Sequence, residues 1–430
     1  MILMKVCVIG LGRIGMPMAA LCAAKGHTVI GVDKGEAALK AVADAEPLFE
    51  EEGLADTMRK NKPRLSATSD IAKAVAASDV VVVTIGTTIT EDGKPVLDNA
   101  YDVARGIAEA KPRGKTVIFK PTLPLGTTRL LVAEIEKKSG LKCGKDFFAA
   151  FSPERIVEGK ALEEMEHLPK VIGGMDAESA RRAAEFYRTL GGEIVIVEKP
   201  EAAELVKLID NSYRSTMFAF ANDVALVCER WGLNAYDVVS AANQGYKRNN
   251  VKKPSCGVSG YCLTKDPLYL ESGFASAAKE RGFPSLWKRG RDINDYMPTH
   301  TLGLLKDALA ESGRPLKGAR VAICGATFKE NVDDVRNSHG IRMADELRRE
   351  GAEVSVWDPR AERIGFPRKK SAEDAFDGAD AVVFTVPHDE FKPLDVASLA
   401  KKMRTPVIVD GWGLFTKLRG SKGYRCVGVG

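Results

Sequence analysis

The stretch from 255 to 267, SCGVSGYCLTKDP, holds the residues best suited to covalent chemistry. It contains two thiols, Cys256 and Cys262, and a Lys-Asp pair follows the second thiol. Lys265 could favour the thiolate of Cys262, and Asp266 could hydrogen-bond a water molecule or a substrate hydroxyl. Glycines before the second thiol predict that it lies in a loop, where functional residues are common. On these residues alone, Cys262 is either a nucleophile or a buried structural thiol.

A second constellation, Gly10-x-Gly12-x-x-Gly15, stands between an apolar run and a helical pattern, and Asp33 ends the next apolar run. This order is typical of the dinucleotide-binding βαβ unit. The glycines permit a tight turn and let the backbone approach a pyrophosphate at the helix N-terminus. Asp33 can accept hydrogen bonds from ribose hydroxyls and would repel the 2′-phosphate of NADP, although Lys34 weakens this discrimination. We therefore expect NAD as the cofactor.

Apolar runs that alternate with helical patterns must position these residues. Runs such as DVVVVTIG (79–86) and KTVIFKPT (115–122) predict buried strands of a parallel sheet that is covered on both faces. The same alternation returns near residue 315, where RVAICGATFK (320–329) echoes the first glycine loop without its full fingerprint. The pattern predicts an α/β fold with two Rossmann-like, doubly wound domains.

A long helical pattern separates the two α/β segments. It begins at Pro200, which suits a first helical turn, and it ends before Gly232, which suits a C-terminal cap. Apolar residues recur along it at helical spacing, so this helix either joins domains or pairs with a partner helix. We expect a dinucleotide-binding domain at 1–199, a central helical domain with the long helix and the thiol loop at 200–312, and a second Rossmann-like domain at 313–430. A ligand cleft between the two α/β domains is the natural expectation.

Composition excludes several classes of protein. The 430 residues are 45% hydrophobic and 28% charged, and the net charge of +5 is spread out, so no nucleic-acid partner is expected. The apolar runs are far shorter than the ~20 residues of a membrane span, and we expect a cytoplasmic protein. The eight cysteines and five histidines follow no metal-binding spacing, so no metal is expected, and most thiols should be buried.

Six ordered blocks resemble the UDP-glucose/GDP-mannose dehydrogenase family. The thiol block, G-x-x-G-Y-C-L-x-K-D (257–266), is similar to the cysteine signature of that family. The remaining blocks are GLGRIGMP (10–17), PTLPLGTT (121–128), SPERIVEG (152–159), AAELVKLIDNSY (202–213) and FKENVDDVRNS (328–338). The resemblance spans nearly the whole chain.

This resemblance implies a four-electron oxidation of the C6 hydroxymethyl group of a nucleotide-bound sugar to a carboxylate, with NAD as hydride acceptor. Cys262 would add to the intermediate aldehyde, and the resulting thiohemiacetal can give up a second hydride. Water would then hydrolyse the thioester. One thiol thereby explains how a single site performs both oxidations without releasing the aldehyde.

Further roles carry over from the family to matching positions. Lys207 and Asn211, four residues apart on the long helix, would serve as oxyanion and substrate-hydroxyl partners. Asp266, Glu154 and Thr122 would position or activate water and relay protons. The expected substrate contacts are Glu154, Arg155, Glu158, Lys207, Asn211, Arg248, Gly260 and Lys329. The expected cofactor contacts are Gly10, Gly12, Arg13, Ile14, Gly15, Asp33, Thr84, Thr122, Lys265 and Arg336.

Other segments of the sequence bear on the substrate and on the oligomeric state. GLGRIGMP, SPERI and PKVIGG (169–174) resemble the branch that acts on UDP-N-acetylhexosamines, which favours UDP-N-acetyl-D-mannosamine, whereas GYCLTKD resembles the UDP-glucose branch. Arg248 resembles an arginine that reaches the substrate of a neighbouring subunit, and the long apolar helix also suggests a homodimer.

Three departures from the family pattern are small: Ile85-Gly86-Thr87-Thr88 replaces a V-P-T-P turn, and the other two changes are single residues. Ser259 stands where glycine is usual, and Pro121 stands where serine is usual. Beside UDP-glucose 6-dehydrogenase, these departures keep open a nucleotide-sugar-binding protein without turnover. A two-electron hydroxyacid or sugar-phosphate dehydrogenase is a further hypothesis, because such an enzyme shares the cofactor domain and a long helix.

Overall fold

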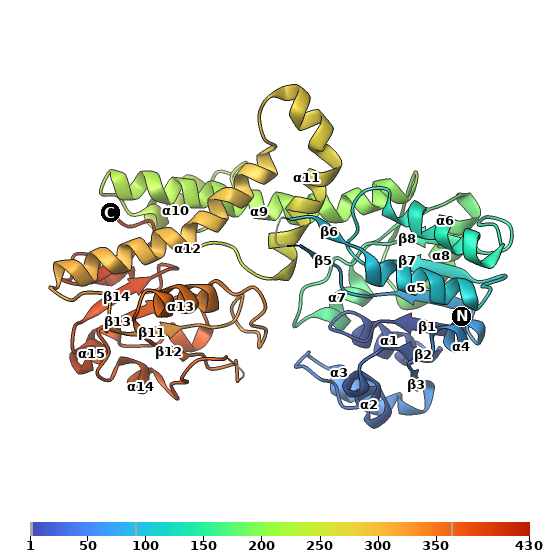
Figure 1. The fold of residues 1–430 in the computed structure, drawn as a ribbon, viewed down its shortest axis with the longest axis horizontal. Coiled ribbons are helices and arrows are strands. Elements are labelled where there is room, and N and C mark those ends of the chain that lie inside the picture. The colour runs from blue at the N-terminus through green and yellow to red at the C-terminus, as the bar shows by residue number, and fades with distance from the viewer. Residues whose placement is uncertain (1–2, 91–92, 363) are drawn as a thin grey trace. The chain divides into compact units, whose positions relative to one another are not determined.

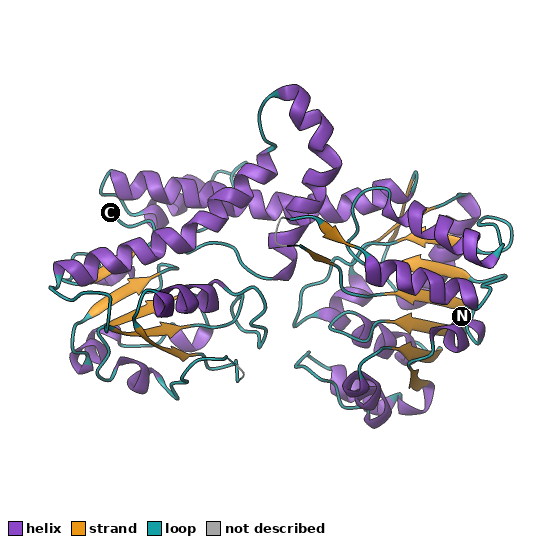
Figure 2. Ribbon diagram, in the orientation of Figure 1, coloured by secondary structure: helices purple, strands orange, loops and turns teal. Residues whose placement is uncertain are grey.

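The chain divides into two compact units (Figure 1). The structure, a computed structural model, describes residues 3–90, 93–362 and 364–430. Unit 1 comprises Met1–Asp210 and Leu268–Ser276, and unit 2 comprises Asn211–Pro267 and Ala277–Gly430. Helices and strands alternate in unit 1 and in residues 320–426 of unit 2, as the sequence pattern predicts, and the fold is of the α/β class (Figure 2).

Unit 1 is built on one twisted sheet with the strand order β10-β9-β8-β7-β4-β1-β2-β3. Its strands are β1 (Lys5–Ile9), β2 (Thr28–Val32), β3 (Leu65–Thr68), β4 (Val80–Val83), β7 (Thr116–Phe119), β8 (Phe148–Phe151), β9 (Lys170–Gly174) and β10 (Ile194–Val197). Neighbouring strands are parallel except β8 and β9, which pair antiparallel. The expected parallel sheet is therefore extended at one side by a pair of strands that run the other way. A short antiparallel ribbon, β5 (Thr88–Ile89) with β6 (Pro95–Val96), follows β4.

Helices cover both faces of this sheet (Figure 2). They are α1 (Gly15–Ala24), α2 (Glu36–Asp44), α3 (Leu54–Lys60), α4 (Ile71–Ala76), α5 (Asp98–Glu109), α6 (Thr127–Ser139), α7 (Ala161–His167) and α8 (Ala177–Leu190), with a 3-10 turn at Lys62–Arg64. Capping side chains set several helix starts. Asp70 accepts a hydrogen bond from the amide of Lys73 at the start of α4, and Asp176 caps α8 through the amide of Ser179.

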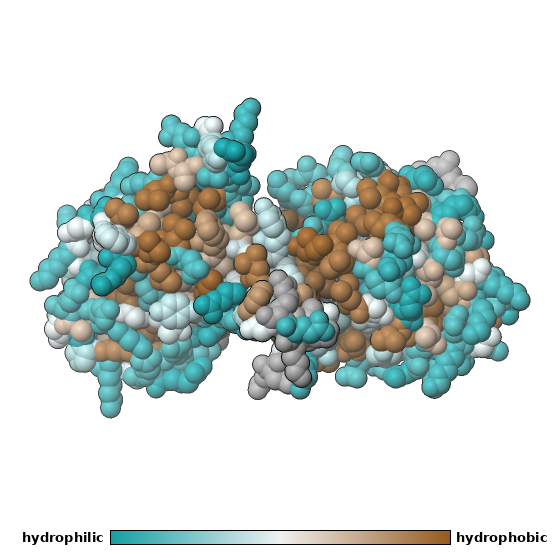
Figure 3. All heavy atoms as spheres, turned by 90° about the horizontal axis from the view of Figure 1, so that it is seen from above, coloured by the Kyte–Doolittle hydropathy of each residue, from teal (hydrophilic) through white to brown (hydrophobic). Residues whose placement is uncertain are grey.

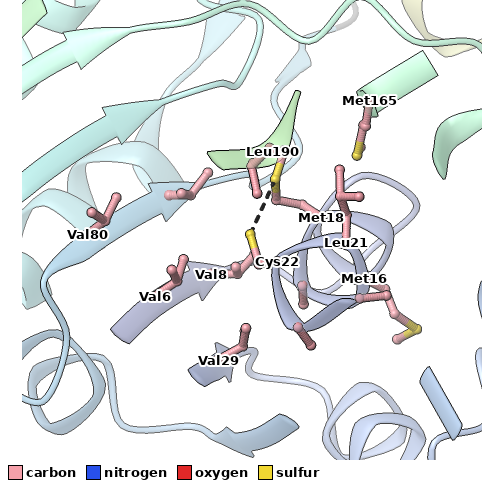
Figure 4. Packing of buried hydrophobic residues seen from close by; sticks show 14 of the residues in the cluster. Val6, Val8, Met16, Met18, Leu21, Cys22, Val29, Val80, Met165 and Leu190 are labelled. Carbon is pink, nitrogen blue, oxygen red and sulfur yellow. Dashed lines mark hydrogen bonds between the residues drawn. The ribbon is translucent and has the colours of Figure 1, made fainter. Parts of the chain in front are cut away.

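Alternation along the strands divides the unit 1 core into two layers. Val6, Val8 and Val82 face one layer, where they pack with α1 and α8, whereas Cys7 and Val81 face the layer under α5 and α6. Figure 4 shows the first of these layers, in which Cys22 of α1 lies beside Val8 of the sheet and Met18 lies beside Leu190 of α8. Each fully buried aliphatic side chain contributes about 1.5–3 kcal/mol, so these layers hold the glycine loop on a rigid base.

Unit 2 begins within the long helix α9 (Pro200–Arg230), whose bounds agree with the sequence prediction. It continues with α10 (Ala235–Asn243), α11 (Tyr261–Arg281) and α12 (Leu286–Glu311). Its sheet has the order β12-β11-β13-β14-β15 and is parallel throughout its registered pairs. The strands are β11 (Arg320–Cys324), β12 (Glu353–Trp357), β13 (Ala381–Phe384), β14 (Val407–Asp410) and β15 (Tyr424–Cys426), and the helices are α13 (His339–Arg349), α14 (Ala372–Phe376) and α15 (Val396–Leu399), with 3-10 turns at Asp389–Phe391, Ala400–Lys402 and Thr416–Leu418.

The apolar stripe expected along α9 is covered on only one side. Leu208 is buried, but Ile209, Tyr213, Phe220 and Val227 are exposed. Periodicity alone could not distinguish these two sides, because both carry apolar residues. Within the part of the chain that the structure describes, no helix combines the length and apolarity needed to cross a membrane.

Candidate active site

The glycine loop after β1 has the geometry of a dinucleotide-binding turn. Gly10 has a φ of +95°, and a Cβ at this position would lie 3.0 Å from the backbone nitrogen of Ile85. A Cβ at Gly15 would lie only 1.7 Å from the carbonyl oxygen of Gly10, so helix and strand can meet this closely only at glycine. Among the described residues, nothing lies within 4 Å of a Cβ built at Gly12, and this open space is where a pyrophosphate would approach.

Asp33 closes the loop at the end of β2. Its carboxylate accepts hydrogen bonds from the amides of Leu11 and Gly35, both at 2.8 Å. A cavity of about 330 Å³ lies in front of this carboxylate, and its lining includes Gly10, Gly12, Asp33, Lys34, Thr84 and Asn99. An apolar-walled pocket with one acid at the ribose position fits NAD.

The other residues predicted around the cofactor take different places. Thr84 donates through its hydroxyl to the carbonyls of Ile9 and Gly10, at 3.0 and 2.8 Å, so it shapes the loop. Ile14 packs against the core beside α1. Arg13 lies 3.7 Å from Glu158, which ties this predicted substrate residue to the glycine loop.

Unit 1 also contains a buried cation–carboxylate pair. Lys120 follows β7 directly, and its Nζ lies 3.3 Å from Oε2 of Glu154 and donates to the hydroxyl of Tyr187 at 3.3 Å. The other oxygen of Glu154 accepts hydrogen bonds from the amides of Arg155 and Ile156. The segment that carries the predicted catalytic acid is thus held from both sides.

Electrostatics keep this pair ionised. Burial by itself would raise the pKa of Glu154, but Lys120, the backbone amides and Lys207 together hold it below its usual value. Burial disfavours the charge on Lys120, yet Glu154 and Tyr187 outweigh that effect and raise its pKa to about 12. Glu154 is therefore a carboxylate at neutral pH, which suits a group that accepts or orients a proton.

Three further predicted residues lie in unit 1. Lys207 is buried on α9 and acts on the charge of Glu154. Arg155 donates to Asp210 at 2.8 Å, so this predicted substrate contact is an ion pair with α9. Thr122 is half-buried, and its carbonyl accepts a hydrogen bond from the hydroxyl of Thr87 at 2.7 Å.

The thiol of Cys262 does not lie in a loop. The loop ends at Gly260, whose φ of +92° favours glycine, and Cys262 is the second residue of α11. Its residue is exposed, whereas the other cysteines are buried or, at Cys143, half-buried. A thiol in the first turn of a helix meets the positive end of the helix dipole, which favours the thiolate. Burial raises the pKa of the Cys256 thiol to about 12, so the two cysteines of this stretch are chemically different.

A buried polar group stands behind the thiol. Lys265 and Asp266, in the same helix, form an ion pair of 2.9 Å, and both are almost fully buried. Asn211 of α9 donates from its amide to the other carboxylate oxygen of Asp266 at 2.5 Å. The fold thus brings together Asn211 and Asp266, two predicted residues that lie 55 positions apart in the sequence and on different helices.

Two more predicted residues of unit 2, Arg336 and Lys329, have different surroundings. Arg336 lies over the ring of Tyr261, as Lys265 does, and donates to Asp334 at 2.9 and 3.0 Å. Lys329 is half-buried, and its carbonyl accepts from the hydroxyl of Thr327.

Arg248 is the outlier among the predicted residues of unit 2. It is exposed, and its guanidinium stacks on the ring of Tyr246. Among the described residues it therefore has no partner in the buried group formed by Lys265, Asp266 and Asn211.

Sequence reasoning missed Lys120 and Tyr261. Lys120 had a usable signal, because a lysine that ends a buried apolar strand needs a buried partner. Tyr261 had none, since an aromatic residue beside a thiol is more often part of a core. No group of three or more His, Cys, Asp or Glu side chains that could hold a metal ion occurs among the described residues.

Comparisons with known proteins agree with this architecture. The NAD binding domain of the UDP-glucose/GDP-mannose dehydrogenase family matches residues 4–191, the central domain matches residues 201–296, and the UDP binding domain matches residues 322–417. A UDP-N-acetyl-D-mannosamine dehydrogenase of Pyrococcus horikoshii is 32% identical over 412 residues, which cover 95% of each chain.

Solved structures show the same likeness. The structure of a UDP-D-ManNAc dehydrogenase from Pyrococcus horikoshii has a TM-score of 0.93 at 31% identity and covers 99% of this chain and 100% of that one. A UDP-glucose dehydrogenase from Pyrobaculum islandicum has a TM-score of 0.88 at 29% identity, with 100% and 98% covered.

The chain belongs to the UDP-glucose/GDP-mannose dehydrogenase family. It is an NAD-dependent nucleotide-sugar dehydrogenase, an oxidoreductase, in which the C-terminal segment is the UDP-binding domain. The family resemblance drawn from the six sequence blocks is confirmed.

Proposed function

We propose that the protein oxidises the C6 hydroxymethyl group of a UDP-N-acetylhexosamine to a carboxylate, with Cys262 as the nucleophile. The observation that carries this proposal is the exposed thiol in the first turn of α11, with the buried Lys265–Asp266 pair in the same helix. A buried structural thiol, the alternative that the sequence left open, would not be exposed. NAD, when bound, supplies the hydride acceptor for both oxidations.

Cys262 accounts for the covalent steps that turn the aldehyde into the acid. The thiol of Cys262 gives up its proton, and the thiolate adds to the carbonyl carbon of the aldehyde to form a C–S bond. The C=O π bond opens, and the oxygen takes up a proton to become the hydroxyl of the thiohemiacetal. Loss of hydride and of the hydroxyl proton leaves a thioester. Water then attacks the thioester carbon and the C–S bond breaks. The sugar acid is released, and the thiol of Cys262 is regenerated.

Proton transfer is assigned to Glu154, and other side chains are assigned to position water and to contact the reacting oxygens. Glu154, ionised beside Lys120, can hold or receive the proton of a water molecule. We assign water positioning to Asp266 and Thr122, and oxyanion and hydroxyl contacts to Lys207 and Asn211.

Substrate and cofactor contacts complete the proposal. Arg155, Glu158, Gly260 and Lys329 are assigned to the substrate, and Lys265 and Arg336 to the cofactor side.

Substrate choice is supported by the named relatives. Proteins named UDP-N-acetyl-D-mannosamine dehydrogenase are 30–32% identical over nearly the whole chain, and a Ralstonia solanacearum relative is named NDP-N-acetyl-D-galactosaminuronic acid dehydrogenase. We therefore propose UDP-N-acetyl-D-mannosamine as substrate, with UDP-glucose as the second candidate because a UDP-glucose dehydrogenase has the same fold.

A stoichiometry experiment tests the reaction. Purified protein is incubated with NAD⁺ and each of several UDP-sugars, and NADH and the sugar acid are counted by absorbance and mass spectrometry. We expect about two NADH for each acid, and loss of acid formation in Cys262→Ala. A ratio near one would indicate a two-electron dehydrogenase, and tight binding without NADH would indicate a nucleotide-sugar-binding protein.

A homodimer is proposed from the uncovered side of α9. Tyr213, Phe220 and Val227 are exposed at spacings that repeat along one side of α9, and Trp231, which follows the helix directly, is 75% exposed. Figure 3 shows apolar side chains gathered on the face that is viewed from above. A twofold pairing through this stripe would bury it. Light scattering should give twice the chain mass, and Phe220→Glu should give one chain mass.

A further inference from the structure

Pro267 creates a defect in the helix that carries the thiol. It lies inside α11, and a proline has no N–H to donate to the carbonyl four residues earlier. That carbonyl belongs to Leu263, the residue next to Cys262. A second element must therefore satisfy the oxygen of Leu263, or the first turn of the helix is weakened.

Arg291 of α12 supplies the missing donor. Its Nη1 donates to the carbonyl of Leu263 at 3.2 Å, and its Nη2 donates to the carbonyl of Val258 at 2.9 Å. The guanidinium is nearly fully buried, and Asp295 on the same helix accepts hydrogen bonds from it at 2.9 and 3.0 Å, which balances its charge. One side chain thus joins two carbonyls that flank Cys262, one in the loop and one in the helix.

The geometry needs an arginine. The planar guanidinium presents several N–H groups at fixed angles, so it can serve two carbonyls and a carboxylate at once, whereas a lysine ammonium is a compact point charge. Earlier parts of the loop are held independently, because Asn222 accepts a hydrogen bond from the amide of Ser255 and Gly411 accepts one from the amide of Cys256. Arg291 therefore acts on the last part of the loop and the first turn of α11.

We propose that Arg291 is a positioning residue for Cys262, which completes the first turn of α11 in place of the N–H that Pro267 lacks. Without it, the turn frays and the thiol loses its fixed orientation. The proposal rests on the proposed function only for the role of Cys262 as nucleophile. The order of the helix turn is measurable without turnover.

A double-mutant cycle tests this relationship. Arg291→Met removes the donors, Pro267→Ala restores an N–H to the chain, and the double variant combines both. Exchange of amide hydrogens in the peptide 258–266 and the rate of alkylation of Cys262 by iodoacetamide are followed by mass spectrometry. Arg289→Met, which alters an exposed arginine on the same helix, is the matched control.

We expect Arg291→Met to raise amide exchange by about threefold to tenfold, the size of one net hydrogen bond, and to change the alkylation rate of Cys262. Pro267→Ala should slow exchange much more in the Arg291→Met background than in the wild-type background. In the first, the new N–H replaces a lost donor to the carbonyl of Leu263, whereas in the second that carbonyl already has the arginine donor. Equal effects of Pro267→Ala in both backgrounds, or an Arg291→Met variant that exchanges like Arg289→Met, would overturn the proposal.

Further readouts separate this proposal from the proposed function. Arg291→Met should lower kcat for acid formation while KM for NAD⁺ stays unchanged. If Cys262→Ala retains acid formation, the proposed function fails, but exchange and alkylation still decide the role of Arg291. Arg291→Lys, which keeps the cation without the fork, should resemble Arg291→Met in exchange, and it carries the same comparison if the methionine variant does not fold.

Discussion

The side-chain amide of Asn211 donates a hydrogen bond of 2.5 Å to the carboxylate of Asp266. Both side chains are buried, and the second oxygen of Asp266 is paired with Lys265. This bond joins α9 to the helix that begins at the thiol. Each partner would be costly to bury alone, so the pair specifies how these two helices meet.

Asn211→Asp should therefore be destabilising in a pH-dependent way. A second carboxylate beside buried Asp266 introduces like-charge repulsion, which is relieved when one of the two binds a proton. We expect thermal unfolding of Asn211→Asp to move closer to that of the wild type at pH 5 than at pH 8. Asn211→Ala, which removes the donor without adding charge, should lose about 1–3 kcal/mol with little pH dependence, and equal pH profiles of the two variants would contradict the assignment.

The open space at Gly12 predicts a variant that folds but loses its cofactor. A Cβ at this position meets no atom of the described residues within 4 Å, so Gly12→Ala should keep the unfolding temperature of the wild type. Its affinity for NAD⁺, measured by calorimetry, should fall by roughly tenfold or more because the methyl group occupies the approach of the pyrophosphate.

Gly15→Ala is the matched contrast to Gly12→Ala. Its Cβ would clash with the carbonyl oxygen of Gly10, so it should unfold at a lower temperature even without cofactor. Unchanged NAD⁺ affinity in Gly12→Ala would show that the pyrophosphate lies elsewhere.

Ser259 has a contact that glycine, the usual residue of the family block, could not make. Its hydroxyl donates to the carbonyl of Phe328 at 2.9 Å, and Lys329 is the next residue. We expect Ser259→Ala to raise KM for the UDP-sugar by about threefold to tenfold, with KM for NAD⁺ unchanged. Ser259→Thr retains a hydroxyl and should stay near the wild type. Equal KM values for Ser259→Ala and the wild type would show that the bond has no effect on substrate binding.

The lowered pKa of Lys170 predicts that the stability of the protein rises with pH. Lys170 is buried in β9, and burial together with the charge of Lys120 lowers its pKa to about 8. Between about pH 8 and 10.5, the folded state has lost this proton while the unfolded state keeps it, so the free energy of unfolding rises with pH.

Lys170→Met isolates this contribution. It should be more stable than the wild type at pH 7, by up to about 3 kcal/mol, and this gain should shrink as the pH approaches 10. Urea unfolding at several pH values measures the difference, with exposed Lys138→Met as control. A gain that is constant across this range would contradict the lowered pKa of Lys170.

Local patterns were sufficient for much of this fold. Valine-rich runs predicted β4 and β7, Pro200 and Gly232 bracketed α9, and glycine spacing with Asp33 predicted the dinucleotide loop. Each of these features depends on residues close together in sequence, where propensity and periodicity act. The same is true of the family blocks, which are short and ordered.

The site depended on contacts between distant residues. Glycines at 257 and 260 argue locally for a loop, yet Cys262 lies in the first turn of a helix, where Arg291 of α12 donates to the carbonyl of Leu263. Likewise, the residue types of Lys120 and Glu154 do not indicate that they pair inside unit 1.

By itself, the sequence determined the class of fold, the cofactor and the family, because these follow from patterns within short segments. Only the tertiary structure decided that Cys262 is exposed while Cys256 is buried, that Asp266 is held by Asn211, and which side of α9 stays uncovered. The physical reason is that burial and hydrogen bonding are properties of the packed chain, and identical residue types take either state until their neighbours are in place.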